Sequence, residues 1–160
     1  MMNLQLALDG SKKKGLKILC LGAHCDDIEI GCGGSIFKLL DKYAINKIYW
    51  VVFASTEERK KEAENSAESF LKTVNDKKVQ IHSYRDGFLP GAWKEIKEEF
   101  EKIKKEFQPD LIFTHFRNDL HQDHRIINEL TWNTFRNHFI LEYEIPKYDG
   151  DLDNPNLFIP

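Results

Sequence analysis

The feature that most constrains this chain is the regular alternation of short apolar segments with amphipathic ones. Apolar segments of strand length occupy residues 16–24, 47–55, 78–84, 110–116 and 138–144. Segments with helical periodicity lie between them, at residues 34–44, 55–74 and 92–107. This alternation predicts βαβ units with right-handed crossovers, and therefore an α/β, Rossmann-like fold of three layers with a mostly parallel sheet. The expected strand order is about 3-2-1-4-5.

Length and composition predict a single domain over residues 1–160, because a chain of this length buries roughly two thirds of its unfolded surface. No apolar run approaches the roughly 20 residues of a membrane-spanning helix, so no membrane span is expected. The opening lysines follow a very short apolar patch, the reverse of a secretory signal, which favours a cytoplasmic location. Residues 145–160 are rich in Pro, Asp and Asn and predict an irregular arm.

Charge and cysteine content exclude several classes of protein. The net charge is -3 with both signs interleaved, so there is no broad basic stripe for nucleic acid. The three cysteines, Cys20, Cys25 and Cys32, are odd in number, and their spacing fits neither a disulfide framework nor a four-ligand zinc site. Cys20 and Cys32 are expected to be buried structural residues.

Two polar clusters are expected to meet at one edge of the sheet. His24, Asp26 and Asp27 follow the first strand, and the segment "THFRNDLHQDHR" (114–125) follows the fourth. Ligands of open α/β sheets bind beyond the carboxyl ends of the strands, near the point where the strand order reverses. The second cluster contributes His121, Asp123 and His124, with His115 and Asp119 close by.

Histidine and carboxylate ligands with one open position are the usual set for a catalytic zinc ion, which lets a water lose its proton near pH 7. The clusters therefore predict metal-dependent chemistry. Plainer alternatives exist, because histidines at strand ends are often only hydrogen-bonded, and "HQDH" can be a helix start with an acid in its first turn. The stretch "GCGGSI" does not match a dinucleotide-binding fingerprint, since Ile36 stands where the third glycine belongs.

The stretches "AHCDDIEIGCGG" and "HQDH" resemble the two motifs of the LmbE-like (PIG-L) family of zinc-dependent N-acetyl-sugar deacetylases. The segments "STEER" (55–59), "DGFLP" (86–90) and "LEYEIPKYDGD" (141–151) also look like family segments, so the likeness covers nearly the whole chain. The resemblance implies a hydrolase that removes the acetyl group from an N-acetylated amino sugar or glycoside, such as an N-acetylglucosamine derivative.

The resemblance also implies the metal and substrate ligands. One zinc ion per chain would be held by His24, Asp27 and His124, and another divalent transition metal in its place stays open. Arg59 and Asp86 are the candidates for contacts with sugar hydroxyls, although their segments could equally be a helix cap and a turn.

Three further residues receive catalytic roles from the resemblance. Asp26 would be the general base that takes a proton from the attacking water. His121 would stabilise the tetrahedral intermediate and protonate the leaving amine, and Asp123 would orient His121.

Two departures from the family pattern leave other functions open. Cys25 stands where the family usually has proline, which frees a backbone N–H and relaxes the turn. Family members usually continue further, so we expect this chain to lack the family's carboxyl-terminal part. The alternatives are a catalytically idle metal-binding or assembly module of the same fold, or a cysteine hydrolase that uses Cys25 with His24 or His121 as base. The sequence also leaves open whether the chain forms a homo-oligomer.

Overall fold

The computed structural model describes residues 15–159 and contains one five-stranded sheet. Its strands are β1 (Leu16–Gly22), β2 (Ile45–Ala54), β3 (Lys77–Tyr84), β4 (Leu111–His115) and β5 (Phe139–Tyr143). The order is β3-β2-β1-β4-β5, and every neighbouring pair is parallel. The predicted order is confirmed, and the sheet, predicted as mostly parallel, is parallel throughout.

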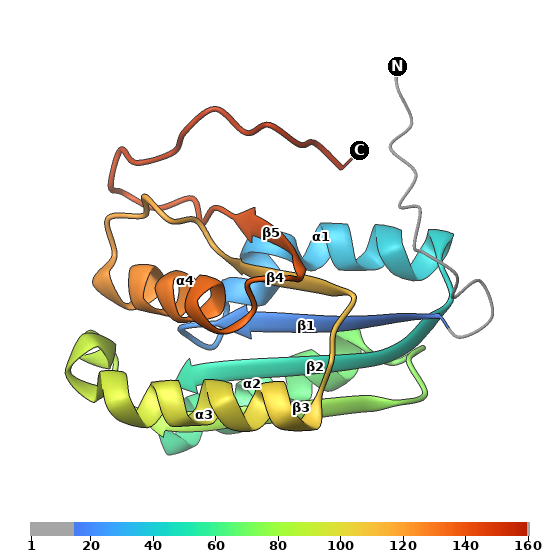
Figure 1. Ribbon diagram of the computed structural model, residues 1–160, viewed down its shortest axis with the longest axis horizontal. Helices are drawn as coiled ribbons and strands as arrows, with labels where there is room; N and C mark the ends of the chain where they lie inside the picture. Colours follow the sequence, from blue (N-terminus) through green and yellow to red (C-terminus); the bar gives the residue numbers. More distant parts are fainter. Residues whose placement is uncertain (1–14, 160) are drawn as a thin grey trace.

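Helices cover both faces of the sheet and complete the three layers (Figure 1). Helices α1 (Asp27–Lys42) and α2 (Glu57–Phe70) pack on one face, and α3 (Trp93–Glu106) and α4 (Gln122–Thr134) on the other. A short 3-10 helix, η1 (Leu89–Ala92), precedes α3. The central strands β1, β2 and β4 are mostly buried on both sides, as expected of a parallel sheet, whereas the edge strands β3 and β5 are only partly buried. Within residues 15–159, no helix combines the length and the apolar character needed to cross a membrane.

Helix α1 begins at Asp27, whereas the periodicity predicted a start at residue 34. The glycine cluster therefore lies inside the helix rather than in a turn before it. A Cβ at Gly33 would lie 2.7 Å from the Phe70 ring, and one at Gly31 would collide with the ring of Tyr143. Close packing against neighbouring rings explains why glycines occur where they weaken a helix. The early start places Asp27 at the first position of the helix.

Helix α4 was not predicted as an element, because several of its buried positions are polar and break the apolar periodicity. Asn128 donates a hydrogen bond to the His115 backbone oxygen at 2.6 Å. The Thr131 hydroxyl contacts that of Thr114 at 2.9 Å and donates to the Ile127 backbone oxygen at 2.7 Å. The contacts to His115 and Thr114 fasten the helix to β4, whose end carries His115.

Residues 145–159 form neither helix nor strand, and run along the outside of the domain after β5 (Figure 1). Their first part contacts the loop between β4 and α4. Lys147 lies 3.0 Å from the Asp119 carboxylate, and the Leu120 backbone N–H donates to Asp151 at 2.8 Å. The expectation about the opening lysines concerns residues outside the described range.

Candidate functional site

The two polar clusters meet at the carboxyl edge of the sheet. β1 and β4 are neighbouring parallel strands, so their ends lie at the same edge. His24 lies between β1 and α1, while His124 lies in the first turn of α4. The two rings are 5.1 Å apart, and His24 Nδ1 lies 3.2 Å from His124 Nε2. The strand order at the switch point thus joins residues that are 100 positions apart in sequence.

Asp27 is buried at the centre of this cluster. Its Oδ2 accepts a hydrogen bond from the His24 backbone N–H at 2.7 Å and lies 3.4 Å from His24 Nδ1. Its Oδ1 lies 3.5 Å from His124 Nε2. Burial opposes ionisation of the carboxyl group, but contacts with the imidazoles of His115, His124 and His24 hold its pKa well below the usual value. The cluster therefore contains a buried carboxylate surrounded by nitrogen ligands.

The orientation of His124 is fixed by Asp119, whose Oδ2 lies 2.9 Å from His124 Nδ1. The proton on Nδ1 points at this carboxylate, so Nε2 faces Asp27 and His24. Burial lowers the pKa of His124, but hydrogen bonds to Asp119 and Asp27 outweigh it and raise the pKa to about 9. A histidine oriented by a carboxylate in this way is the usual arrangement around a protein-bound metal ion.

The donor atoms predicted as zinc ligands fit one ion. The three closest approaches between His24 Nδ1, His124 Nε2 and the Asp27 carboxylate are 3.2, 3.4 and 3.5 Å. Ligands about 2.0–2.1 Å from a tetrahedral zinc ion are separated by about 3.3 Å. Three other clusters among the described residues also group possible ligands: His24, His121 and His124; Asp27, His115 and His124; and His24, Asp86 and Asp123.

His115 is placed less well to be a ligand, although it is completely buried beside Asp27. Its Nε2 accepts a hydrogen bond from the Ala23 backbone N–H at 2.9 Å and faces Asp27 Oδ2 at 3.1 Å. Burial lowers the pKa of His115 despite the neighbouring Asp27. Because the Nε2 lone pair already accepts the Ala23 N–H, it is not free to bind a metal ion, and His115 packs beside Asp27 at the end of β1.

Asp123 makes different contacts from those expected. Its buried carboxylate accepts hydrogen bonds from the backbone N–H groups of Gly87 and Leu89, at 2.7 and 3.1 Å. It also lies 3.2 Å from His24 Nε2. Only its backbone N–H contacts His121, whose Nδ1 accepts the hydrogen bond at 3.2 Å. The Asp123 side chain thus orients His24 and the turn after β3.

His121 caps α4 and stands above the cluster, with its ring 4.8 Å from that of His24 and 4.6 Å from that of His124. Burial and the neighbouring His124 and His24 lower its pKa. Because Nδ1 accepts the Asp123 N–H, the proton of the neutral ring lies on Nε2.

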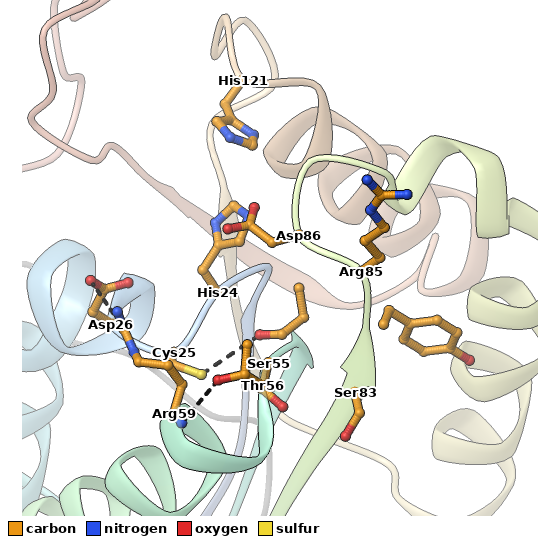
Figure 2. Close-up of a pocket in the computed structure, with 12 residues that line it drawn as sticks. His24, Cys25, Asp26, Ser55, Thr56, Arg59, Ser83, Arg85, Asp86 and His121 are labelled. Atoms are coloured by element: carbon orange, nitrogen blue, oxygen red, sulfur yellow. Dashed lines mark hydrogen bonds and ion pairs between the residues drawn. The ribbon is translucent and has the colours of Figure 1, made fainter.

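A pocket of about 500 Å³ opens beside the cluster and is lined by five of the predicted site residues (Figure 2). They are His24, Asp26, Arg59, Asp86 and His121. The Asp26 carboxylate is half exposed and lies 3.4 Å from the Arg59 guanidinium. Although Asp26 is the N-cap residue of α1, its side chain makes no capping hydrogen bond. Asp86 Oδ1 lies 3.1 Å from His24 Nε2.

Cys25 also lines this pocket, but its thiol is mostly buried and donates a hydrogen bond to the Ala54 backbone oxygen at 3.6 Å. Burial raises the pKa of the thiol, against the attraction of Arg59. A thiol that is protonated at neutral pH is a poor nucleophile. Cys20 and Cys32 are buried and free, as expected.

Lys147 is the site residue that sequence reasoning missed, and Asp119 received no role there. Lys147 lies in a segment without periodicity, about twenty positions from the "HQDH" motif. Its only signal was its position within the family-like segment "LEYEIPKYDGD".

The fold is a parallel α/β sheet, and the histidine and carboxylate side chains gathered at its switch point are of the kind that can hold a metal ion. The family of GlcNAc-PI de-N-acetylases (PIG-L) matches residues 19–135, and the chain belongs to this family. No curated protein sequence is significantly similar to the chain.

Solved structures with this fold include several deacetylases. An N,N'-diacetylchitobiose deacetylase from Pyrococcus horikoshii is 29% identical over 81% of this chain and 52% of its own, with a TM-score of 0.60. The chain thus spans about half the length of that enzyme. A triple mutant of a deacetylase from the teicoplanin biosynthetic pathway is 17% identical over 87% of this chain and 69% of its own, with a TM-score of 0.66. A zinc-inhibited form of teicoplanin deacetylase Orf2 is 14% identical over 87% of this chain and 73% of its own, with a TM-score of 0.64. The two teicoplanin structures support the fold alone.

Proposed function

We propose that the chain is a zinc-dependent deacetylase that hydrolyses the acetamide of an N-acetylated amino sugar or glycoside. The carrying observation is the convergence of His24, Asp27 and His124 beside a pocket in a member of the PIG-L family. When bound, the metal ion supplies Lewis-acid polarisation of the acetyl carbonyl and lowers the pKa of water.

Asp26 takes the role of general base in this proposal. It lines the pocket, its carboxylate is half exposed, and no capping bond occupies it. A carboxylate on the pocket wall can accept a proton from water as the water attacks the acetyl carbon. The Arg59 guanidinium holds Asp26 in place and can donate hydrogen bonds to sugar hydroxyls. The Asp86 carboxylate can accept hydrogen bonds from sugar hydroxyls.

His121 is placed to act on the other side of the reacting amide. Its Nε2 carries the proton of the neutral ring, so it can donate a hydrogen bond to the oxyanion that develops as water attacks. To protonate the leaving amine from Nε2, His121 must first take up a second proton on Nδ1, which gives up the hydrogen bond that Nδ1 accepts from the Asp123 N–H. Asp123 assists indirectly, because its carboxylate fixes His24 and its backbone N–H fixes the His121 ring.

The cysteine-hydrolase alternative is less well supported, because the Cys25 thiol is hydrogen-bonded to a backbone oxygen and its pKa is raised. An idle metal-binding module remains the second candidate. The cytoplasmic location, the absence of a nucleic-acid partner and a homo-oligomeric state stay predictions.

The test measures acetate release from a panel of N-acetyl sugars, after zinc is removed by a chelator and after it is restored. His124→Ala should lose both zinc and activity. His138→Ala is the matched control, because this histidine contacts Phe135 outside the site. Zinc binding without acetate release from any sugar would favour the idle module.

A further inference from the structure

The arm after β5 reaches the proposed metal centre through the side chain of Lys147. Lys147 Nζ lies 3.0 Å from Asp119 Oδ2, the same oxygen that contacts His124 Nδ1 at 2.9 Å. Within residues 15–159, the other ion pair of Lys147 is with Asp151, at 2.6 Å. The oxygen that orients His124 is therefore shared with a lysine more than twenty positions later in the chain.

The two acids that Lys147 contacts are almost completely buried. The side chains of Asp119 and Asp151 are 2% and 5% exposed, and that of Lys147 is 17% exposed. A carboxylate removed from water is costly unless a cation or several hydrogen-bond donors contact it. Lys147 therefore offsets the desolvation cost of the acid that orients His124.

Most contacts that hold Asp119 come from its own segment. Its Oδ1 accepts the His121 backbone N–H at 2.7 Å, and its backbone oxygen accepts a hydrogen bond from the Arg125 guanidinium at 2.9 Å. Lys147 adds a contact from a different part of the chain, and this contact falls on Oδ2, the oxygen that faces His124. Local contacts thus hold one side of the carboxylate, while the arm holds the side that orients the ligand.

The first part of the arm is anchored on both sides of Lys147 (Figure 1). Ile145 is buried, and its Cδ1 would lie 2.9 Å from a Cβ at Gly31 of helix α1. Asp151 accepts the Leu120 backbone N–H at 2.8 Å. The backbone that carries Lys147 is therefore fixed to α1 before the lysine and to the loop between β4 and α4 after it.

We propose that Lys147 is a positioning residue for His124, acting through Asp119 Oδ2, and that the arm is thereby part of the metal centre. A cation beside Asp119 keeps its oxygen in place, so that this oxygen holds the Nδ1 proton of His124 and Nε2 stays aimed at Asp27. This inference rests on the proposed function, because it assumes that His124 binds metal.

Zinc affinity, measured by competition with a chelator, is the first test. Lys147→Met should lower the affinity about tenfold, as for other groups that orient metal ligands. Lys147→Arg should recover most of the loss, because arginine keeps the charge. Parent-like affinity in Lys147→Met would overturn the inference.

A double-mutant cycle with Asp119→Asn separates positioning from a general structural role. If Lys147 acts through Asp119, its contribution disappears once that carboxylate is gone. Lys147→Met should therefore change the zinc affinity by less than about threefold in the Asp119→Asn background. Equal losses in the two backgrounds would show that Lys147 acts by another route and would overturn the inference.

NMR of the metal-free protein tests the same contact without zinc. The signal of the His124 Nδ1 proton, assigned by its absence from His124→Ala, should exchange with water faster in Lys147→Met than in the parent. In the parent, this proton should also show a nuclear Overhauser effect to the Lys147 side chain, because both nitrogen atoms lie within 3.0 Å of one oxygen. Absence of that effect would overturn the inference even if Lys147→Met did not fold.

Lys97→Met is the matched control, since the Lys97 side chain is 20% exposed, pairs with Glu101 and donates to Thr134 away from the site. It should lose stability but keep both the zinc affinity and the exchange rate of the His124 proton. The same loss of affinity in Lys97→Met as in Lys147→Met would contradict a specific role of Lys147. If the parent binds no zinc, the deacetylase proposal fails, and the metal-free NMR comparison still decides whether Lys147 positions His124.

Discussion

The cluster around Asp27 and the pocket wall around Asp26 differ in every contact they make, although the two acids are adjacent. The Asp27 side chain is 5% exposed and touches three imidazoles, whereas the Asp26 side chain is 55% exposed and pairs with one guanidinium. The start of α1 causes the difference, because the first residue of the helix turns toward the sheet and the N-cap residue turns toward the pocket. Burial fixes one carboxylate for a metal ion, and exposure leaves the other available to a substrate.

The largest expected effect comes from exchanging each acid for its amide. Asp27→Asn should reduce bound zinc from about one ion per chain to near zero, because the charged ligand is lost. Asp26→Asn should keep the zinc and lower turnover by about a hundredfold to ten-thousandfold, the usual value of a positioned base. Zinc analysis and acetate release, measured on both variants, check the pair. Equal effects of the two substitutions on zinc would remove the contrast between buried and exposed acid.

Sequence reasoning could predict the features that depend on local pattern, but not those that depend on contacts between distant segments. Alternating apolar segments predicted the strand order, since pattern and crossover rules together leave few topologies. The predicted start of α1 was wrong. Glycines are unfavourable inside a helix, and the reason for them here is the close packing of the Tyr143 and Phe70 rings, which occurs only in the folded state. The partners of Asp123 and Lys147 were missed for a similar reason. Both residues contact segments that are distant in sequence, namely the turn at Gly87 and the carboxylate of Asp119.

The pH dependence of zinc binding tests the role of the buried cluster around Asp27. Burial lowers the pKa of His124, but its hydrogen bonds to Asp119 and Asp27 raise it to about 9 in the metal-free protein. Below that pH the ion must displace a proton, and the pKa of His24 is raised as well, so affinity should rise at least about tenfold per pH unit up to about pH 9 and then level off. Competition titrations across this range measure the slope. An affinity independent of pH would mean that His124 releases no proton and is not a ligand.

The stability of the metal-free protein should change with pH in the opposite direction. The folded pKa of His124 lies above the ordinary value of a histidine, so its contribution is fully present below about pH 6.5. That contribution is lost as the pH rises through about 9. Urea unfolding of the metal-free protein at several pH values checks the sign, and Asp119→Asn should flatten the dependence.

A smaller effect is expected on the exposed side, at Arg59. Arg59→Gln removes the partner of Asp26 and a donor to the sugar, so KM should rise about tenfold, as expected for one charge-assisted hydrogen bond. Zinc content should not change. A variant with altered zinc content would place Arg59 with the buried cluster instead of the pocket wall.

The smallest effect is expected at Cys25, which lies between the two regions. Serine can donate the hydrogen bond to the Ala54 oxygen that the thiol donates now, so Cys25→Ser should retain activity close to that of the parent. Complete loss of turnover with zinc still bound would instead support a nucleophilic thiol.

The central claim is that His24, Asp27 and His124 hold one metal ion without help from a cysteine. X-ray absorption spectroscopy of the zinc-loaded protein tests it most directly, because sulfur and nitrogen or oxygen ligands lie at different distances. The account predicts only nitrogen and oxygen ligands at about 2.0–2.2 Å, with the scattering pattern of two imidazoles. A sulfur ligand at about 2.3 Å, or a spectrum without the scattering of two imidazoles, would contradict it.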